Sequence, residues 1–418
     1  MQRWLKFSKF LPEYRWQPVI YTPENPDVPV ADESLCEDID VRTEVVTTRI
    51  TEPYDLYRKI FRVSKEDGAK NRIHSDAKSG FRSSVANFIR ANFFVPDPRA
   101  LWIRSSVKFL KEYLINHPVD MIISTGPPHS MHLIAYKLTK KIPCPWIADF
   151  RDPWTGMFYF KHLNMLPPIR ARHRVLEREV VNSADMVLVV SNRMKENFSK
   201  IQGADPSKIK VITNGYDPDD FLRVEKQENT KFTIVHTGLM VRDGNPENVW
   251  KALKAMLDAN PSMGDDLEIR LIGETDSMVF ESIEENGLSE YLKHIPYLPH
   301  QEAVEEQVAA SLLLLPLRDE PEAGVILTGK FFEYLASERP ILAIGPKNGD
   351  LGNAIRECNA GDIYEFSEYD AVLECLKLHY ENYINGGKNL KPQNKEAVSK
   401  YSRKELTRSL AEIMQVLE

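Results

Sequence analysis

The stretch E-A-G-V-I-L-T-G-K-F-F-E-Y-L-A-S-E-R-P-I-L-A-I-G-P, residues 322–346, decides the fold of the second half of the chain. Small residues lead to Thr328, after which an apolar face predicts a helix that Pro340 ends. Residues 341–344 then predict a short, buried parallel strand. Loop, helix and strand in this order form a βαβ-type unit, in which ligands bind at the carboxyl ends of the strands.

The start of this helix predicts a site for an anion. Free backbone amides near Thr328 and Gly329, with Lys330 beside them, suit a phosphate group. Glu333 lies one turn further on, where a carboxylate accepts hydrogen bonds from ribose hydroxyls. The alternative is an ordinary amphipathic helix with Lys330 and Glu333 paired on its solvated face.

Length and composition predict two globular domains. The 418 residues suit two domains of roughly 200 residues each, and 42% hydrophobic with 28% charged residues is ordinary globular composition. The net charge of -7 gives no general case for nucleic acid binding. The four cysteines (Cys36, Cys144, Cys358 and Cys375) lack C-x-x-C or partner histidine spacing, which predicts a reduced chain without a structural metal.

No run approaches the ~18 apolar residues of a membrane helix, and the N-terminus lacks an apolar signal core. We therefore expect a cytoplasmic protein, at most peripheral at the inner face of the membrane. Residues 57–111 carry thirteen Lys or Arg against four Asp or Glu, and aromatic residues interleave with arginines around a helix predicted at 82–93. This mixture suits an anionic membrane surface, and the alternative is a solvated basic face over core aromatics.

The first half of the chain opens on a helix, followed by strands predicted at 18–22 and 41–47. An α/β domain that begins with its first helix lacks the strand that should precede it. We therefore expect either a truncated start or a first domain whose sheet lacks this strand and has exposed pairing edges.

Two further strands, at 121–124 and 145–148, end on loops with polar side chains. His129 follows the first strand, in a loop that leads to a helix with Ser130 as the expected cap, and Asp149, Arg151 and Asp152 follow the second. Because neighbouring strand ends share one edge of a parallel sheet, we expect these side chains in one site. The alternatives are a helix-cap role for His129 and an internal salt-bridged turn for the other three.

The alternation of strands and helices restarts after residues 222–230, a polar linker. Strands are predicted at 232–238, 267–273, 294–297 and 311–316. Just before the linker, Asp217, Asp219 and Asp220 imitate a metal-binding D-x-D, but we interpret them as surface turn residues. His236 is interpreted as a core or cleft histidine. Zinc, a serine triad and a P-loop motif have no support.

Six segments resemble retaining family-four glycosyltransferases of the GT-B fold (glycosyl transferases group 1), in family order. They are S-T-G-P-P-H-S-M-H-L at 124–133, W-I-A-D-F-R-D-P-W at 146–154, S-A-D-M-V-L-V-V-S at 183–191, V-I-T-N-G-Y-D-P-D-D-F at 211–221, H-T-G-L at 236–239 and G-K-F-F-E-Y-L-A at 329–336. The resemblance implies an α/β protein of two Rossmann-like domains facing a cleft. Residues 1–222 would form the acceptor-side domain and 223–400 the nucleotide-sugar domain, with a last helix at 401–418 crossing back.

The resemblance implies a hexosyltransferase-type enzyme of polysaccharide biosynthesis. It would move a sugar from a nucleoside diphosphate donor, first of all a UDP-sugar, to a glycan or lipid-linked acceptor, with retention and without metal or cofactor. By match of motif, Glu333 holds the ribose, and the amides near Thr328 and Gly329, with Lys330, hold the diphosphate. The remaining donor residues implied are Gly238 and Arg242 at the phosphates, and Glu274 and Tyr297 beside the base.

On the acceptor side, the resemblance implies His129 and Arg151 nearest the anomeric carbon, oriented by Asp149 or Asp152, with Glu322 against the sugar. The family places two glutamates eight residues apart, whereas Glu322 stands eleven residues before Glu333. Two alternatives remain open: a nucleotide-sugar epimerase of the same fold, and a catalytically weak nucleotide-sugar-binding or scaffold protein.

Overall fold

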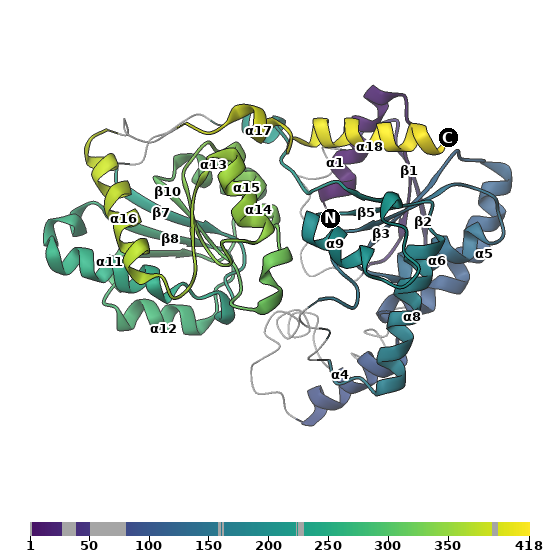
Figure 1. Cartoon of the computed structure of the whole chain (residues 1–418), viewed down its shortest axis with the longest axis horizontal. Coiled ribbons are helices and arrows are strands. Elements are labelled where there is room, and N and C mark those ends of the chain that lie inside the picture. The colour runs from purple at the N-terminus through teal and green to yellow at the C-terminus, as the bar shows by residue number, and fades with distance from the viewer. Residues whose placement is uncertain are drawn as a thin grey trace. The chain divides into compact units, whose positions relative to one another are not determined.

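A computed structural model describes residues 2–26, 39–50, 81–157, 160, 163–222, 224, 230–386 and 392–418. The chain divides into two compact units (Figure 1). The C-terminal unit comprises the described residues among 1–10 and 213–408, and the N-terminal unit those among 11–33, 39–212 and 409–418. The C-terminal unit thus begins at Thr213, before the predicted boundary at 222, and it also includes the first helix of the chain.

The C-terminal unit is built on a six-stranded parallel sheet in the order β12-β11-β10-β7-β8-β9. Its strands are β7 (Phe232–Thr237), β8 (Leu267–Ile272), β9 (Leu292–Ile295), β10 (Leu312–Pro316), β11 (Ile341–Ile344) and β12 (Gly361–Tyr364). The continuous run Leu312 to Leu315 in β10 is buried because a central parallel strand is covered on both faces. The strand predicted at 294–297 lies two residues earlier, at β9.

Helices cover both faces of this sheet (Figure 1). Helices α11 (Glu247–Ala259), α12 (Ser277–Glu285) and α16 (Tyr369–Ile384) share one hydrophobic cluster with Phe232 and Ile234 of β7. On the other face lie α13 (His300–Ala309), α14 (Gly329–Ala336) and α15 (Asp350–Cys358), where Val235 packs with α14 and α15. This alternation along β7 is the period of two expected for a strand. The unit also contains α10 (Asp219–Leu222), α17 (Lys395–Ser399) and the first part of α18 (Arg403–Leu417).

The N-terminal unit holds two parallel sheets. The larger has the order β3 (Ile122–Gly126), β4 (Trp146–Phe150), β5 (Met186–Val189) and β6 (Ile209–Val211), and the smaller pairs β1 (Val19–Pro23) with β2 (Glu44–Thr48). Tyr21 of β1 stacks on Trp102 with ring centroids 5.0 Å apart, and the Trp102 indole donates to Thr48 at 3.0 Å. Trp102 begins α5 (Trp102–Asn116), so this helix carries the small sheet.

The other helices of this unit are α4 (Phe81–Phe93), α6 (Ser130–Thr139), α8 (Pro167–Ser183) and α9 (Asn192–Ser199). The helix predicted at 82–93 is confirmed as α4. The predicted cap of α6 is wrong: the carboxylate of Asp97 accepts from the Ser130 amide at 2.8 Å, across 33 residues of sequence. None of the described helices is both long enough and apolar enough to cross a membrane.

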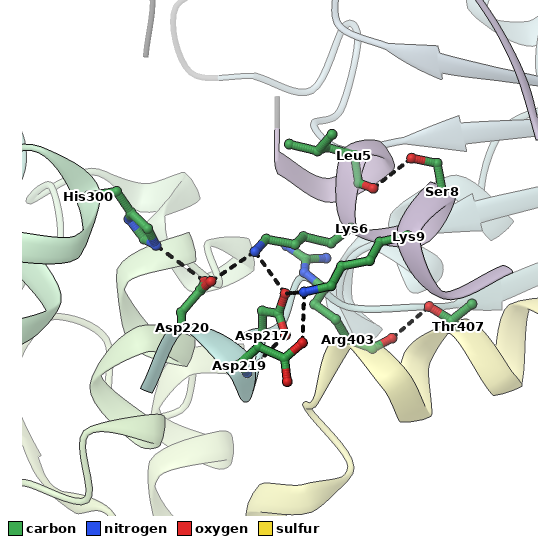
Figure 2. A network of polar contacts seen from close by, with 10 residues as sticks. All are labelled: Leu5, Lys6, Ser8, Lys9, Asp217, Asp219, Asp220, His300, Arg403 and Thr407. Atoms are coloured by element: carbon green, nitrogen blue, oxygen red, sulfur yellow. Dashed lines mark hydrogen bonds and ion pairs between the residues drawn. The ribbon is translucent and has the colours of Figure 1, made fainter. Parts of the chain in front are cut away.

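Helix α1 (Gln2–Phe10) is attached to the turn that begins the C-terminal unit (Figure 2). The Asp217 side chain is fully buried and accepts from both Lys6 and Lys9, each at 2.8 Å. Lys9 also pairs with Asp219, and Lys6 with Asp220. The interpretation of these aspartates as surface turn residues is therefore wrong for Asp217, because its partners are encoded more than 200 residues away.

Candidate functional site

The first cluster of polar groups lies where β7 ends and α14 begins. Thr328 is the N-cap of α14, and its hydroxyl accepts from the Lys330 amide at 3.2 Å. Gly329 is exposed, and its backbone amide makes no hydrogen bond to any residue that the structure describes. The predicted change from loop to helix at these residues is confirmed, and it leaves an N–H group facing outward, as an anion requires.

Lys330 supplies the cation of this cluster. Its ammonium donates to the carbonyl of Leu239 at 2.9 Å and to Nε2 of His236 at 3.1 Å. Among the described residues no carboxylate lies within ion-pair distance of it, so the alternative of a solvated pair with Glu333 is wrong. Desolvation lowers the pKa of Lys330 to about 8.

His236 is a neutral acceptor for this lysine. Its Nδ1 lies 2.9 Å from the Leu314 carbonyl, so that nitrogen carries the proton and Nε2 accepts. Burial, and then the charge of Lys330, lower the His236 pKa to about 3. The interpretation as a core or cleft histidine is confirmed, since its side chain is buried.

Two glycines allow the strand exits to approach this lysine. Gly238 has φ +92°, and a Cβ there would lie 2.7 Å from Cε of Lys330. Gly273, at the exit of β8, has φ +118°, and its Cβ would meet the Gly238 carbonyl oxygen at 2.6 Å. A larger residue at either position would strain the backbone; at Gly238 it would also displace Lys330, and at Gly273 it would collide with the backbone of Gly238.

Glu333 is held in place by a side chain that sequence reasoning missed. Gln307 of α13 donates to Oε2 of Glu333 and to the hydroxyl of Thr237, both at 3.1 Å. The Thr237 amide in turn donates to the Tyr334 hydroxyl at 2.9 Å. Oε1 of Glu333 has no hydrogen-bond donor in the described part of the chain, and burial raises the pKa of this carboxyl. The signal for Gln307 was a polar residue on the apolar face of its helix, beside Val304 and Val308.

The other predicted donor residues lie on loops after the strands. Arg242 is exposed in the short turn after β7 and makes no ion pair within the described ranges. Glu274, after β8, is exposed, and Tyr297, after β9, is 57% exposed. Glu322 is partly buried in the turn Pro321–Val325 before α14. In the described structure, no hydrogen bond joins Arg242, Glu274 or Tyr297 to Lys330 or Glu333.

The N-terminal unit gathers a second set of polar groups at the ends of β3 and β4. The Thr125 hydroxyl donates to Asp149 at 2.9 Å, and the Arg151 amide donates to the Gly126 carbonyl at 2.9 Å. The Arg151 guanidinium donates to the carbonyl of Pro127. The prediction that these loops come together is therefore confirmed. Asp149 is fully buried, however, so this arrangement presents it to Thr125 rather than to a ligand.

His129 lies in the same cluster, as a buried and neutral side chain. Its ring stacks on Trp154 with centroids 4.6 Å apart and parallel planes. Neither ring nitrogen has a hydrogen-bond partner among the residues described, and desolvation lowers the His129 pKa well below its usual value. His129 occupies the N-cap position of α6 without a capping side-chain bond. Asp152, two residues before Trp154, has a pKa raised by burial.

Part of the predicted basic segment, residues 57–80, lies outside the described residues. The described part exposes large apolar side chains: Ile89 and Phe93 of α4 are 42% and 73% exposed, and Leu101 is 55% exposed. Arg90 lies beside Ile89 on α4, and exposed Arg104 follows Leu101. The Asn92 side chain joins α4 to the start of α8, accepting from the Leu166 amide at 2.7 Å.

Comparison with known proteins gives one family match and a consistent fold. The model of Glycosyltransferase Family 4 matches residues 72–220. No curated protein matches the sequence significantly. A glycosyltransferase from Rickettsia africae is similar in structure at 14% identity and a TM-score of 0.62, over 100% of this chain and 94% of that one.

Two further solved structures are similar over nearly their full length. Anabaena HepE in complex with UDP-glucose is 12% identical with a TM-score of 0.63, over 100% of this chain and 95% of its own. Sucrose-phosphate synthase from Thermosynechococcus elongatus is 13% identical with a TM-score of 0.61, over 99% and 92%. These likenesses and the larger parallel sheet of each unit confirm the predicted α/β fold with two Rossmann-like domains, as in GT-B glycosyltransferases.

Proposed function

We propose that this protein is a glycosyltransferase that transfers a hexosyl group from a UDP-sugar to a glycan or a lipid-linked acceptor. The observation that carries the proposal is Lys330, a desolvated cation at a helix start that is held by a neutral histidine and a carbonyl. A buried cation that forms no ion pair attracts an anion. The family match and neighbours solved with UDP or UDP-glucose support a nucleoside diphosphate as that anion.

The proposed donor site uses each group in one role. The Lys330 ammonium and the Gly329 amide contact the diphosphate, and Gly238 leaves room for it beside the strand end. Oε1 of Glu333 accepts from the ribose hydroxyls while Gln307 fixes Oε2. Arg242, which is exposed on the adjacent loop, closes on the phosphates as a second cation.

The proposed chemistry is charge stabilisation on the leaving group. When the bond from the anomeric carbon to the diphosphate breaks, negative charge builds on the phosphate oxygens, and Lys330, Arg242 and the Gly329 amide stabilise it. These groups do what a divalent cation would otherwise do, so we propose transfer without a metal ion or other cofactor. We propose retention of configuration, with the acceptor hydroxyl entering on the face that the diphosphate leaves.

For the acceptor side we propose the loops after β3 and β4, with Arg151 nearest the reacting carbon. His129 and Asp149 are buried in the described structure, so we assign them to holding this loop pair, through Trp154 and Thr125 respectively. Glu322, in the turn before α14, is proposed to contact the donor sugar.

We also propose that the protein works in the cytoplasm, in peripheral contact with the inner face of the membrane. Ile89, Phe93 and Leu101 supply exposed apolar side chains beside basic residues, the combination that inserts between anionic headgroups.

Sedimentation with vesicles of phosphatidylglycerol at low salt tests this contact. Phe93→Asp should lower binding severalfold, whereas Ile384→Asp, at an exposed position of the other unit, should not. Equal binding of both variants removes the proposal.

Calorimetric titration with UDP, GDP and UDP-sugars tests the donor site, and release of UDP from the bound sugar, with and without acceptor, tests turnover. We expect UDP to bind more tightly than GDP and the donor to be hydrolysed slowly. Lys330→Met should abolish binding, with Lys251→Met on the exposed face of α11 as the control. Binding of no nucleotide would exclude an enzyme on this donor. Binding with sugar interconversion indicates the epimerase, and binding without turnover the scaffold protein.

A further inference from the structure

We propose that Asp362, Cys375 and His379 form a zinc-binding site in the C-terminal unit. One carboxylate oxygen, the Sγ and one imidazole nitrogen all lie within 4.8 Å of one another. Ligand atoms on a tetrahedral zinc ion lie about 3.3–3.8 Å apart, given bonds of about 2.0–2.3 Å. Small rotations of the three side chains therefore bring their atoms to bonding distance around one ion.

The fold itself places these three residues together. Cys375 and His379 are four residues apart on α16, so they lie on one face of the helix. On β12, Ile363 is buried in the cluster that contains α15, whereas Tyr364 packs in the cluster that contains α16. Asp362 has the same parity as Tyr364 and lies on the α16 side of the strand. The site therefore joins α16 to the edge strand of the sheet.

The three proposed ligands differ in exposure to solvent. Cys375 and His379 are each 5% exposed, whereas Asp362 is exposed. The His379 side chain forms no hydrogen bond to a residue that the structure describes, so its ring nitrogens are available to an ion. A metal bond would supply a partner, and the exposed carboxylate leaves a path for the ion.

The ligand set selects the metal. A thiolate with an imidazole favours a borderline-soft ion such as Zn²⁺, while Mg²⁺ and Ca²⁺ prefer oxygen ligands only. Zinc binds the thiolate form of a cysteine, so binding releases the Cys375 proton to solvent, one proton for each zinc bound. A water molecule would complete the fourth position.

The proposed ion is separate from the donor site and from its chemistry. None of its three ligands is a proposed donor residue, and its role would be to hold α16 against β12. The expectation of a chain without a structural metal rested on the absence of C-x-x-C pairs and of partner histidine spacing. It overlooked the Cys375-x-x-x-His379 spacing, which is a ligand pair only when the segment is helical.

Titration of the full-length, chelator-treated protein with Zn²⁺ and with Co²⁺ tests the site. We expect one ion per chain, a rise in melting temperature, and a thiolate-to-cobalt charge-transfer band in the near ultraviolet. Asp362→Asn changes an exposed side chain and should keep the fold while weakening zinc at least about 10-fold. Cys375→Ser should abolish the cobalt band, and Cys144→Ser, at the half-buried thiol of the other unit, should leave it unchanged.

Two results would overturn the proposal. One is a wild-type protein that binds no zinc at micromolar concentration. The other is a zinc affinity and cobalt spectrum that Asp362→Asn and Cys375→Ser leave the same as in the Cys144→Ser protein, which would place the ion elsewhere. UDP binding serves as the independent measure of fold for each variant.

Discussion

The ammonium of Lys330 donates to Nε2 of His236 across 3.1 Å, although Glu333 lies one helical turn away on the same helix. The carboxylate is turned instead toward Gln307. Lys330 therefore forms no ion pair among the described residues, and its ammonium remains available to an anion. A helix that merely faced solvent would have no reason to hold its lysine against a neutral imidazole.

Replacing Lys330 with methionine should abolish nucleotide binding and stabilise the protein. Its pKa of about 8 shows that the folded protein disfavours the charged amine, so removing that charge should raise the free energy of unfolding at pH 7 by on the order of 1 kcal/mol. The gain should shrink between about pH 8 and pH 10, where only the unfolded wild type still binds the proton. Calorimetry and thermal melts measure both effects. A destabilised variant would mean that Lys330 is a packing residue.

The affinity for UDP should depend on pH through the same lysine. Below about pH 8 the free protein carries a charged Lys330, and above it the amine loses its proton, so the dissociation constant should rise about tenfold between pH 7 and pH 9. His236 and His129 stay neutral throughout this range because burial lowers their pKa values. Isothermal titration at each pH measures the trend. A flat profile would show that another cation binds the phosphates.

Changing Glu333 to glutamine should weaken uridine nucleotides about 10- to 30-fold, the effect of about 1.5–2 kcal/mol of hydrogen bonding to the ribose. The decisive comparison measures the affinity of both proteins for UDP and for 2′,3′-dideoxy-UDP. The variant and the wild type should bind the dideoxy compound equally. Glu247→Gln, on the exposed face of α11, is the matched control. If the loss for the dideoxy compound matched that for UDP, Glu333 would act only through the fold of α14.

Changing Asp217 to asparagine should lower the free energy of unfolding by about 3 kcal/mol. The substitution leaves Lys6, which is almost fully buried, with one fewer carboxylate and removes one of the two partners of Lys9. Urea denaturation followed by tryptophan fluorescence measures the change. Asp258→Asn, in an exposed pair with Lys254, should leave the midpoint unchanged. Similar midpoints for the two variants would refute the role of the buried pair.

Local patterns predicted the parts of the fold that local chemistry decides. The run from Leu312 to Leu315, the Thr328 cap and the strand at 341–344 each follow from residues within a few positions of one another. Glu333 and Lys330 were placed at the same helix start for the same reason. Gly238 was assigned from the resemblance of its motif, and the structure adds that its backbone has a positive φ.

Contacts between distant segments were not predictable in this way. Gln307 reaches Glu333 across 26 residues, and Asp97 caps the helix at Ser130 across 33. The burial of Asp149 and of His129 depends on how Thr125 and Trp154 pack, which no periodicity encodes. The sequence therefore indicated which loops meet, and the structure decided which of their side chains remain open to a ligand.

The ion pairs between α1 and Asp217 can form only after the ribosome has made both segments. Lys6 leaves the ribosome 211 residues before its carboxylate partner exists. At about 5–20 residues per second, the first helix waits roughly 10–40 s with two lysines and its apolar face unmatched. During that interval α1 must avoid binding elsewhere, so it is made long before it can acquire its native partner.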